Sequence, residues 1–425
     1  MKTLYRLTLC LGIVMAYVFL CGCKNVSHIK DVWGSIVEFS KKETSFYIVE
    51  CSENGRIKYG LLNSLGKEVI PCKYDYIESA GNELIKALQN GKFGFFNTSG
   101  EIVIPFNYDY AKSFSEGLAA IEQNGKWGFI NTSGEIVIPF QYYGAYSFSE
   151  GLAAVKQNGK YGFINTQGEI VIRCLYDNVR DFSEGVAAVC EDGEWTLIDT
   201  QGAYFYLCYY NDIEPFSEGL ARVEQNGKFG FINTEGEIVV PFNYADAKSF
   251  SEGLLLIEKN GKRGFINTQG EIVVPFQYDD AYSFSEGLAR VEQNGKYGFI
   301  NTQGEIVVPF NYDSAFSFSE GLAAVKQNGK YGFINTQGEI VIPFKYDSIE
   351  SFSGGFGLGE RNGNLFIIDL KGKEVGQLYN SDELDDFSGF NNGVAIIAYG
   401  DKYGLINTKG EEITPCTYDL ITLIE

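Results

Sequence analysis

Residues 117–150 read GLAAIEQNGKWGFINTSGEIVIPFQYYGAYSFSE, and this stretch decides the fold because strand-forming segments alternate in it with glycine turns. The segments from Leu118 to Gln123 and from Trp127 to Thr132 are rich in aliphatic, aromatic and β-branched residues, which favour pleated strands. Asn124-Gly125 lies between them and is the strongest short hairpin signal, because both residues accept a positive φ. The first half of the stretch is therefore predicted to be a β-hairpin.

A second turn and a third strand complete the unit. Ser133-Gly134 marks the turn, and the strand is predicted from Ile136 to Phe140, with Pro139 near its end. Proline lacks an N–H donor, so this strand is expected to stop there or to lie at a sheet edge. A helical period of 3.6 residues is absent, and the glycine turns would break helices. Each unit is therefore predicted to be a three-stranded meander followed by a loop through Phe148-Ser149-Glu150-Gly151.

The unit recurs with a period of 34 residues, which is also the period of the helical tetratricopeptide repeat. The glycine turns exclude that helical class. Thr196 and Phe366 replace the glycine of a recurring Lys-aromatic-Gly tripeptide in two units. The last step is 38 residues long, so four residues are inserted between Leu378 and Phe390. Eleven units extend from about residue 36 to the C-terminus. The glycines of this column are Gly60, Gly94, Gly128, Gly162, Gly230, Gly264, Gly298, Gly332 and Gly404.

The repeat pattern predicts an all-β protein in which eleven tandem units of about 34 residues form an extended or superhelical array. A propeller-like closure is the alternative. Propellers usually have about four to eight blades of four strands each, which favours the array over the ring.

The N-terminus has the pattern of an export signal. Lys2 and Arg6 precede an apolar run from Leu7 to Leu20 that is too short to span a bilayer as a helix. The run ends in Leu20-Cys21-Gly22-Cys23, which resembles the signal of bacterial lipoproteins, where cleavage precedes a lipid-modified cysteine.

This resemblance divides the chain into a lipoprotein signal peptide at residues 1–22, a tether at residues 23–35 that is lipidated at Cys23, and the repeat array at residues 36–425. It implies a protein anchored by lipid to a bacterial membrane, in the periplasm or at the cell surface. A plain secretory signal cleaved near Gly22 is the alternative.

Charge and composition exclude several classes of function. The 55 acidic and 34 basic residues give a net charge of −21, which argues against nucleic-acid binding and suits basic or cation-bridged partners. His28 is the one histidine of the sequence, so most metal sites and every histidine-based triad are excluded. The carboxylates recur in equivalent columns, such as those of Glu116, Glu135 and Asp109, and lack the unequal environments that acid–base catalysis needs. We therefore expect no enzyme activity, no cofactor and no metal.

Six cysteines follow the anchor region. Cys72, Cys174, Cys208 and Cys416 occupy the column that holds Phe140 in its unit, so they are interpreted as replacements of a core phenylalanine. A bridge between Cys174 and Cys208 is the alternative. Cys190 occupies a column of charged residues and is expected to face solvent.

The Lys-aromatic-Gly column, with Lys126-Trp127-Gly128 as its fullest example, and the recurring segments GFINT and GEIV resemble the bacterial WG-repeat family, also called KWG repeats. The resemblance covers nearly all of the chain after the signal. It implies exported or surface proteins made of β-rich repeats, with interaction roles and no established catalytic residues. The sequence departs from the pattern at Thr196, Arg263, Leu365 and Phe366.

Two non-catalytic functions follow from the repeats. In the first, the array is a scaffold for envelope or surface proteins, since a repeated surface presents similar patches many times. The segment 378–390 is then a candidate contact, as are three arginines that interrupt near-identical units: Arg222, Arg263 and Arg290. In the second, aromatic residues such as Trp127 and Tyr161 bind glycan or cell wall, although core packing also explains that column. A plain spacer is a further alternative.

Overall fold

The computed structural model describes residues 45–53, 55–244, 250–378 and 384–424. The predicted signal peptide (1–22) and tether (23–35), with Cys23 and His28, lie outside these ranges. Every helix or strand assigned within them is a β-strand, and they contain no helix with the length and hydropathy needed to cross a membrane.

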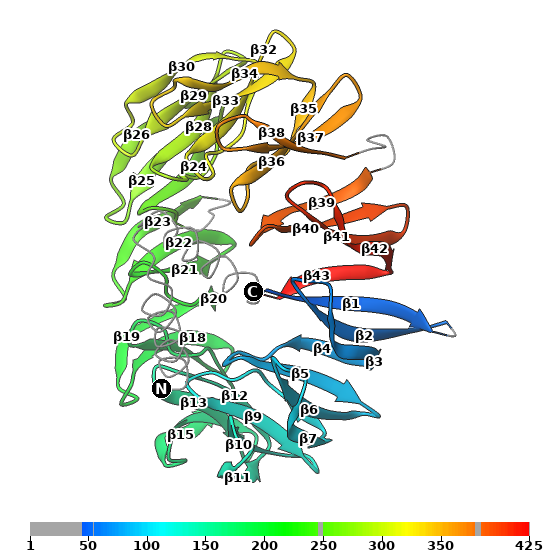
Figure 1. Cartoon of the computed structure of the whole chain (residues 1–425). Helices are drawn as coiled ribbons and strands as arrows, with labels where there is room; N and C mark the ends of the chain where they lie inside the picture. The colour runs from blue at the N-terminus through cyan, green and yellow to red at the C-terminus, as the bar shows by residue number, and fades with distance from the viewer. Residues whose placement is uncertain (1–44, 54, 245–249, 379–383, 425) are drawn as a thin grey trace, which may run out of the picture.

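The strands form eleven small antiparallel sheets, numbered here as blades 1 to 11 (Figure 1). Blade 1 consists of β1 (Phe46–Glu53), β2 (Arg56–Asn63), β3 (Glu68–Tyr74) and β43 (Leu420–Ile424). Blades 2 to 4 consist of β4 (Tyr76–Ser79), β5 (Leu84–Gln89), β6 (Lys92–Asn97) and β7 (Ile102–Tyr108); β8 (Tyr110–Ala111), β9 (Leu118–Gln123), β10 (Lys126–Asn131) and β11 (Ile136–Tyr142); and β12 (Gly144–Ser149), β13 (Leu152–Gln157), β14 (Lys160–Asn165) and β15 (Ile170–Tyr176).

The remaining blades repeat the same plan, with three described strands in blade 7. Blades 5 to 7 consist of β16 (Asn178–Val179), β17 (Val186–Glu191), β18 (Glu194–Asp199) and β19 (Tyr204–Tyr210); β20 (Asp212–Ile213), β21 (Leu220–Gln225), β22 (Lys228–Asn233) and β23 (Ile238–Tyr244); and β24 (Leu254–Lys259), β25 (Lys262–Asn267) and β26 (Ile272–Tyr278). Blades 8 to 11 consist of β27 (Asp280–Ala281), β28 (Leu288–Gln293), β29 (Lys296–Asn301) and β30 (Ile306–Tyr312); β31 (Ser314–Ala315), β32 (Leu322–Gln327), β33 (Lys330–Asn335) and β34 (Ile340–Tyr346); β35 (Ser348–Ile349), β36 (Phe356–Arg361), β37 (Asn364–Asp369) and β38 (Glu374–Leu378); and β39 (Leu384–Asn391), β40 (Val394–Tyr399), β41 (Lys402–Asn407) and β42 (Glu412–Tyr418).

The predicted three-stranded unit gains a short fourth strand. In blade 3, β8 has two residues, Tyr110 and Ala111, which pair with Glu122 and Ile121 of β9. The expected strands correspond to β9, β10 and β11, and Asn124 and Gly125 have φ values of 53° and 73° in the hairpin between β9 and β10. A two-residue strand leaves no alternating pattern in the sequence. The loop predicted through Phe148 and Ser149 is wrong in the quoted unit, because both residues belong to β12 and pair with Ala153 and Leu152 of β13. β11 is the outer edge of the sheet, as its proline predicts.

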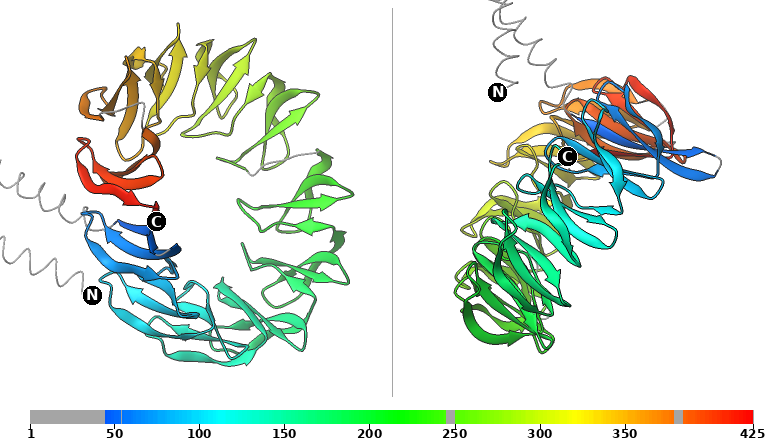
Figure 2. Two further views of the ribbon diagram at one scale, coloured as in Figure 1. Left: turned by 90° about the vertical axis from the view of Figure 1, so that its right-hand side faces the viewer. Right: turned by 90° about the horizontal axis from the view of Figure 1, so that it is seen from below.

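The blades are arranged around a closed ring, which is the propeller-like alternative of the prediction (Figure 2). The C-terminal strand β43 pairs antiparallel with β1, from Phe46 opposite Ile424 to Glu50 opposite Leu420. The C-terminus lies on the inner side of the ring (Figure 2). Blade 1 is therefore built from both ends of the repeat array, and this pairing closes the ring.

The hydrophobic core is divided among the interfaces between blades. Between blades 3 and 4, Phe129 and Tyr142 of blade 3 pack with Phe148, Val155 and other residues of blade 4. A comparable cluster joins blades 1 and 11, where Tyr47 and Val49 pack with residues of β40 and β41. Each blade thus buries its two faces against its two neighbours.

The glycine of the Lys-aromatic-Gly column allows the outer strand to approach its neighbour. A Cβ atom on Gly128 would lie 2.5 Å from the Ile138 carbonyl oxygen and 2.9 Å from the Pro139 carbonyl carbon. The pairing register of β10 and β11 shifts at the same point, between Trp127 and Phe129. The corresponding contact to a carbonyl oxygen ranges from 2.4 Å at Gly162 to 2.9 Å at Gly94.

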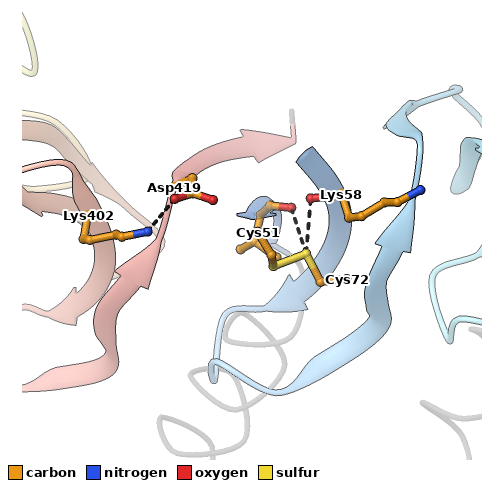
Figure 3. The surroundings of a disulfide bond; sticks show 6 residues. Cys51, Lys58, Cys72, Lys402 and Asp419 are labelled. Atoms are coloured by element: carbon orange, nitrogen blue, oxygen red, sulfur yellow. Dashed lines mark hydrogen bonds and ion pairs between the residues drawn. A yellow bond between two sulfur atoms is a disulfide. The ribbon is translucent and has the colours of Figure 1, made fainter. Parts of the chain in front are cut away.

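The structure corrects two predictions about cysteines. Cys72 is not a free core residue, because it forms a disulfide with Cys51, with the Cα atoms 6.3 Å apart (Figure 3). β1 and β3 both neighbour β2, which brings the two side chains within bridging distance although they belong to different columns. Cys190 does not face solvent: it is 7% exposed, in a cluster with Trp195 and Tyr210, and its burial raises the pKa of its thiol.

The other described cysteines of the Phe140 column agree with replacement of a core phenylalanine. Cys174 and Cys416 are free and half-buried, and each packs against a hydrophobic cluster. The side chain of Cys208 lies outside the described part of the structure, while the free state of Cys174 rules out a bridge between these two.

We expect Gly128→Ala to lower the free energy of unfolding by about 1–3 kcal/mol, because the new methyl group overlaps backbone atoms that cannot move independently. Chemical denaturation of the full chain measures the change. Gly144→Ala is the matched control, since its Cβ atom would lie 3.3 Å from the Cβ atom of Lys156 and its three nearest neighbours are side-chain atoms. Equal stability of the two variants would contradict the explanation.

Removal of the disulfide by Cys51→Ala with Cys72→Ala should destabilise the blade that closes the ring. The bridge spans 21 residues, and a loop of that length is worth about 3 kcal/mol in the chain-entropy account. The unfolding temperature of the oxidised chain should exceed that of the double variant, and a reducing agent should remove most of the difference. Cys174→Ala, which deletes a free thiol, is the control and should respond little to reduction.

Candidate binding pocket

Two sets of polar contacts join successive blades, and the junctions that depart from them can be compared. In the first set, a serine hydroxyl of one blade donates to a backbone carbonyl of the next: Ser115 Oγ lies 2.7 Å from Phe148 O. The neighbouring Glu116 accepts a hydrogen bond from the Gly151 N–H at 3.0 Å. The same glutamate contact recurs for Glu150, Glu184, Glu218, Glu252, Glu286 and Glu320.

In the second set, an aspartate between two blades binds both of them. Asp109 pairs through Oδ1 with Lys92 of blade 2, and its Oδ2 accepts the Asn124 N–H of blade 3 at 2.7 Å. We call this three-residue arrangement the Lys–Asp clasp. The other aspartates that bind both a lysine and the next hairpin are Asp75, Asp177, Asp279, Asp313 and Asp347.

The clasp lowers the pKa of its carboxyl group. The hydrogen bond from Lys92 holds the pKa of Asp109 below its ordinary range, and the Asn124 N–H acts in the same direction. Lysine contacts lower the pKa of Asp177, Asp279, Asp313 and Asp347 in the same way. The aspartates and the recurring glutamates therefore have structural roles at the blade junctions.

The junction between blades 10 and 11 lacks half of each set. Gly354 stands in the column of the contact glutamate, where Asn82 and Asn392 also replace it in two other units, and Asn364 stands in the lysine column. Asp385 keeps the second half of the clasp, because its Oδ2 accepts the Gly400 N–H at 2.6 Å. Among the described residues, no basic side chain pairs with Asp385.

A pocket of about 400 Å³ lies at this junction. Two of its lining residues are smaller than their counterparts in blade 3: Leu365 and Ser348 stand where blade 3 has Trp127 and Tyr110, whose ring centroids are 5.7 Å apart. The pocket is lined by Ser348, Ile349, Glu350, Leu358, Glu360, Leu365, Leu384, Asp385, Asp386 and Phe387.

Four carboxylates face this pocket, and none of them has a described ion-pair partner. Glu360 accepts a hydrogen bond from the Ser348 hydroxyl at 2.8 Å, and Asp386 accepts the Phe387 N–H at 2.9 Å. Glu350 and Asp385 complete the set. The pocket therefore combines a negative, mostly polar surface with a smaller apolar part and is suited to a cation that carries a short aliphatic chain.

The predicted arginines are engaged within the chain. Arg222 forms an ion pair with Glu214 and lies over the ring of Phe229, with its guanidinium carbon 4.3 Å from the ring centroid. Arg263 forms an ion pair with Asp280 in blade 8. The charge of both residues is thus neutralised where the structure places them.

Arg290 contributes to the contact between blades 8 and 9. Its guanidinium carbon lies 3.5 Å from the centroid of the Tyr282 ring, and it donates a hydrogen bond to the Ala315 carbonyl. The three arginines lie in blades 6, 7 and 8 and form no joint patch with the pocket between blades 10 and 11.

The predicted aromatic residues are half-buried at junctions between blades. Trp127 packs against the cluster between blades 3 and 4, and the Tyr161 ring lies 5.7 Å from that of Tyr146. Tyr110 is 45% exposed and has aromatic neighbours on both sides, Phe93 at 5.4 Å and Trp127 at 5.7 Å between ring centroids. Core packing therefore explains much of this column, and Tyr110 adds an accessible ring to it.

The sequence indicates where the pocket lies but does not indicate its chemistry. Four of its lining residues, Leu384 to Phe387, belong to the segment 378–390, of which residues 379–383 lie outside the described part of the structure. Asn364 in the lysine column is a second signal. It indicates a missing clasp lysine, which can be recognised only from the structure of the other junctions. Groups of three or more residues able to hold a metal ion are absent from the described ranges.

Comparison with known proteins identifies the repeat. A family model described as WG containing repeat matches residues 59–93, 93–127, 127–161, 161–195, 195–229, 229–262, 264–297, 297–331, 331–363 and 403–424. No curated protein sequence matches the chain.

Several solved structures are similar to the chain at low identity. A eukaryotic initiation factor is 12% identical, with 89% of this chain and 98% of that chain covered and a TM-score of 0.41. The extracellular domain of a hybrid two-component system from B. thetaiotaomicron is 9% identical, with 85% and 69% covered and a TM-score of 0.26. BamB from Moraxella catarrhalis is 12% identical, with 71% and 95% covered and a TM-score of 0.26. These likenesses are too distant to support an argument about function.

The Lys–Asp clasps predict that the ring loses stability in acid. A carboxyl group whose pKa is lowered on folding stabilises the folded state above its ordinary pKa of about 3.9, and this contribution is lost as the pH falls through the lowered value. The unfolding temperature should therefore fall below about pH 4. Asp109→Asn with Asp313→Asn should make the fall shallower, while an unfolding temperature that stays constant from pH 7 to pH 3 would contradict the role of the clasps.

Proposed function

The chain belongs to the family of proteins with WG-containing repeats, and on this premise we propose that it is an exported, lipid-anchored and non-catalytic scaffold that binds other proteins in the bacterial cell envelope. Family membership supplies the repeat architecture. The proposal about export and binding rests on the N-terminal pattern and on the pocket between blades 10 and 11.

The anchor is inferred from the sequence. Leu20, Gly22 and Cys23 stand at the positions that a lipoprotein signal requires, so Cys23 would carry the lipid after cleavage. Several acyl chains on one cysteine hold a protein stably at a membrane. The chain from Cys23 to the first described strand, β1 at Phe46, would then connect the ring to the membrane.

A binding role is supported by the way the junctions are built. Among the described residues, complete Lys–Asp clasps occur at six junctions, whereas the junction between blades 10 and 11 leaves carboxylates unpaired around a pocket. Among the described residues, this is the junction at which the clasp aspartate is kept and its lysine is lost, and it offers a partner a distinct position. This pocket is the observation that carries the proposal.

The absence of catalysis is part of the proposal and rests on the carboxylates. The recurrent glutamates and aspartates bind backbone N–H groups or lysines at blade junctions, in similar surroundings from one unit to the next. Glycan binding remains a second candidate, and the half-exposed ring of Tyr110 between Phe93 and Trp127 is the observation that favours it.

In-cell crosslinking of the full chain, followed by purification and mass spectrometry, tests the scaffold. We expect one or a few envelope proteins to be enriched in proportion to the bait, and Cys23→Ala to reduce their recovery because the ring is no longer held at the membrane. Labelled fatty acid should be incorporated into the wild-type chain and not into Cys23→Ala. Enrichment of no protein at all, together with retention on cell-wall glycan, would replace the scaffold by the second candidate.

A further inference from the structure

We propose that the pocket between blades 10 and 11 binds a lysine side chain of the partner protein, which supplies the cation that the repeat itself supplies at other junctions. This inference rests on the proposed scaffold function and names the chemistry of its partner. It is argued from the incomplete clasp, from the lining of the pocket and from the charges around it.

The clasp defines what is missing. At the junction of blades 8 and 9, the Lys296 ammonium pairs with Asp313, whose other oxygen accepts the Asn328 N–H at 3.2 Å. At the junction of blades 10 and 11, Asp385 accepts the Gly400 N–H in the same way, but Asn364 stands in place of the lysine. The oxygen of Asp385 that would bind a lysine ammonium therefore has no described basic partner.

At two other junctions that depart from the clasp, no aspartate is left without its lysine. Between blades 5 and 6, Glu194 replaces the lysine and Asn211 replaces the aspartate, so both charges of the pair are lost together. Asn211 still accepts the Asn226 N–H at 2.9 Å. Between blades 3 and 4, Tyr143 replaces the aspartate and the Lys126 ammonium lies 3.2 Å from the centroid of its ring. Asp385 is the described case in which the acid is kept and the lysine is lost.

The pocket fits a lysine better than a small cation. Leu365, Leu384 and Phe387 supply apolar surface that suits the four-carbon stem of lysine, while Glu350, Glu360 and Asp386 add negative charge. The described carboxylates do not form a group close enough to hold a metal ion. A volume of about 400 Å³ leaves room for the side chain and for part of the backbone that carries it.

The net charge of the chain makes a matched comparison necessary, because an acidic protein attracts any basic peptide. The probe is a fluorescein-labelled peptide with blocked ends, Gly-Leu-Lys-Lys-Leu-Gly, and the control peptide has norleucine in place of both lysines. Norleucine keeps the four-carbon stem and lacks the ammonium group. Fluorescence anisotropy with the full chain in detergent measures both dissociation constants.

Three variants of the full chain that change the net charge by the same single unit locate the binding. Asn364→Lys restores the missing lysine of the clasp, and Asp385→Asn removes its acid. Asp313→Asn changes an aspartate that Lys296 already neutralises at another junction. Asn364→Lys should leave the unfolding temperature unchanged or raise it, so that loss of binding in this variant is not loss of folding.

We expect the lysine peptide to bind at least ten-fold more tightly than the norleucine peptide. Asn364→Lys and Asp385→Asn should each weaken the binding about ten-fold, while Asp313→Asn should change it less than two-fold. Equal binding of the two peptides would overturn the inference, and so would unchanged binding to Asn364→Lys. If crosslinked envelope proteins are recovered equally with wild type and Asn364→Lys, the lysine assignment fails while the scaffold stands. Recovery of no protein overturns the scaffold, and the peptides still decide the chemistry of the pocket.

Discussion

The structure depends on the contact of each blade with the next, because a sheet of four short strands cannot bury either of its faces alone. Phe129 of blade 3 becomes fully buried through residues of blade 4. The Lys–Asp clasps and the serine and glutamate contacts then hold neighbouring blades in one position. Glu116 adopts a φ of 52°, a backbone region that is unfavourable for glutamate, and its bond to the Gly151 N–H offsets this cost.

Closure of the ring follows from the same requirement. An open array would leave one apolar face exposed to solvent at each end. Ring closure buries these two faces against each other. Tyr47 and Val49 of blade 1 pack with Val394 and Leu405 of blade 11, and Lys402 forms an ion pair with Asp419 next to the closing strand (Figure 3). The usual number of propeller blades reflects the frequency of known rings and sets no limit on closure, which explains why the sequence favoured an open array while the structure is closed.

The sequence predicts what each unit encodes locally and misses what arises between units. The hairpin at Asn124-Gly125 and the edge position of the Pro139 strand follow from local rules, and the structure confirms both. The disulfide between Cys51 and Cys72 joins two columns, so comparison of equivalent positions could not reveal it. Cys190 was assigned to solvent from its charged column, but its small side chain is covered by the cluster that includes Trp195. The pocket also lies between units, and the sequence indicates only one of its walls, which belongs to the segment 378–390.

A substitution at a repeat position can be interpreted once the contacts that accommodate the new residue are known. Phe366 replaces a column glycine, and β38 pairs with β37 there without the register shift that other blades show, so the larger residue is accommodated. Arg263 replaces an aromatic residue and forms an ion pair with Asp280. These exchanges are balanced inside the chain. The loss of lysine at Asn364 is balanced by no described side chain, and the acid that it leaves faces a pocket. Because no described residue of the chain replaces the lost lysine, we expect a basic group of another molecule to pair with this acid.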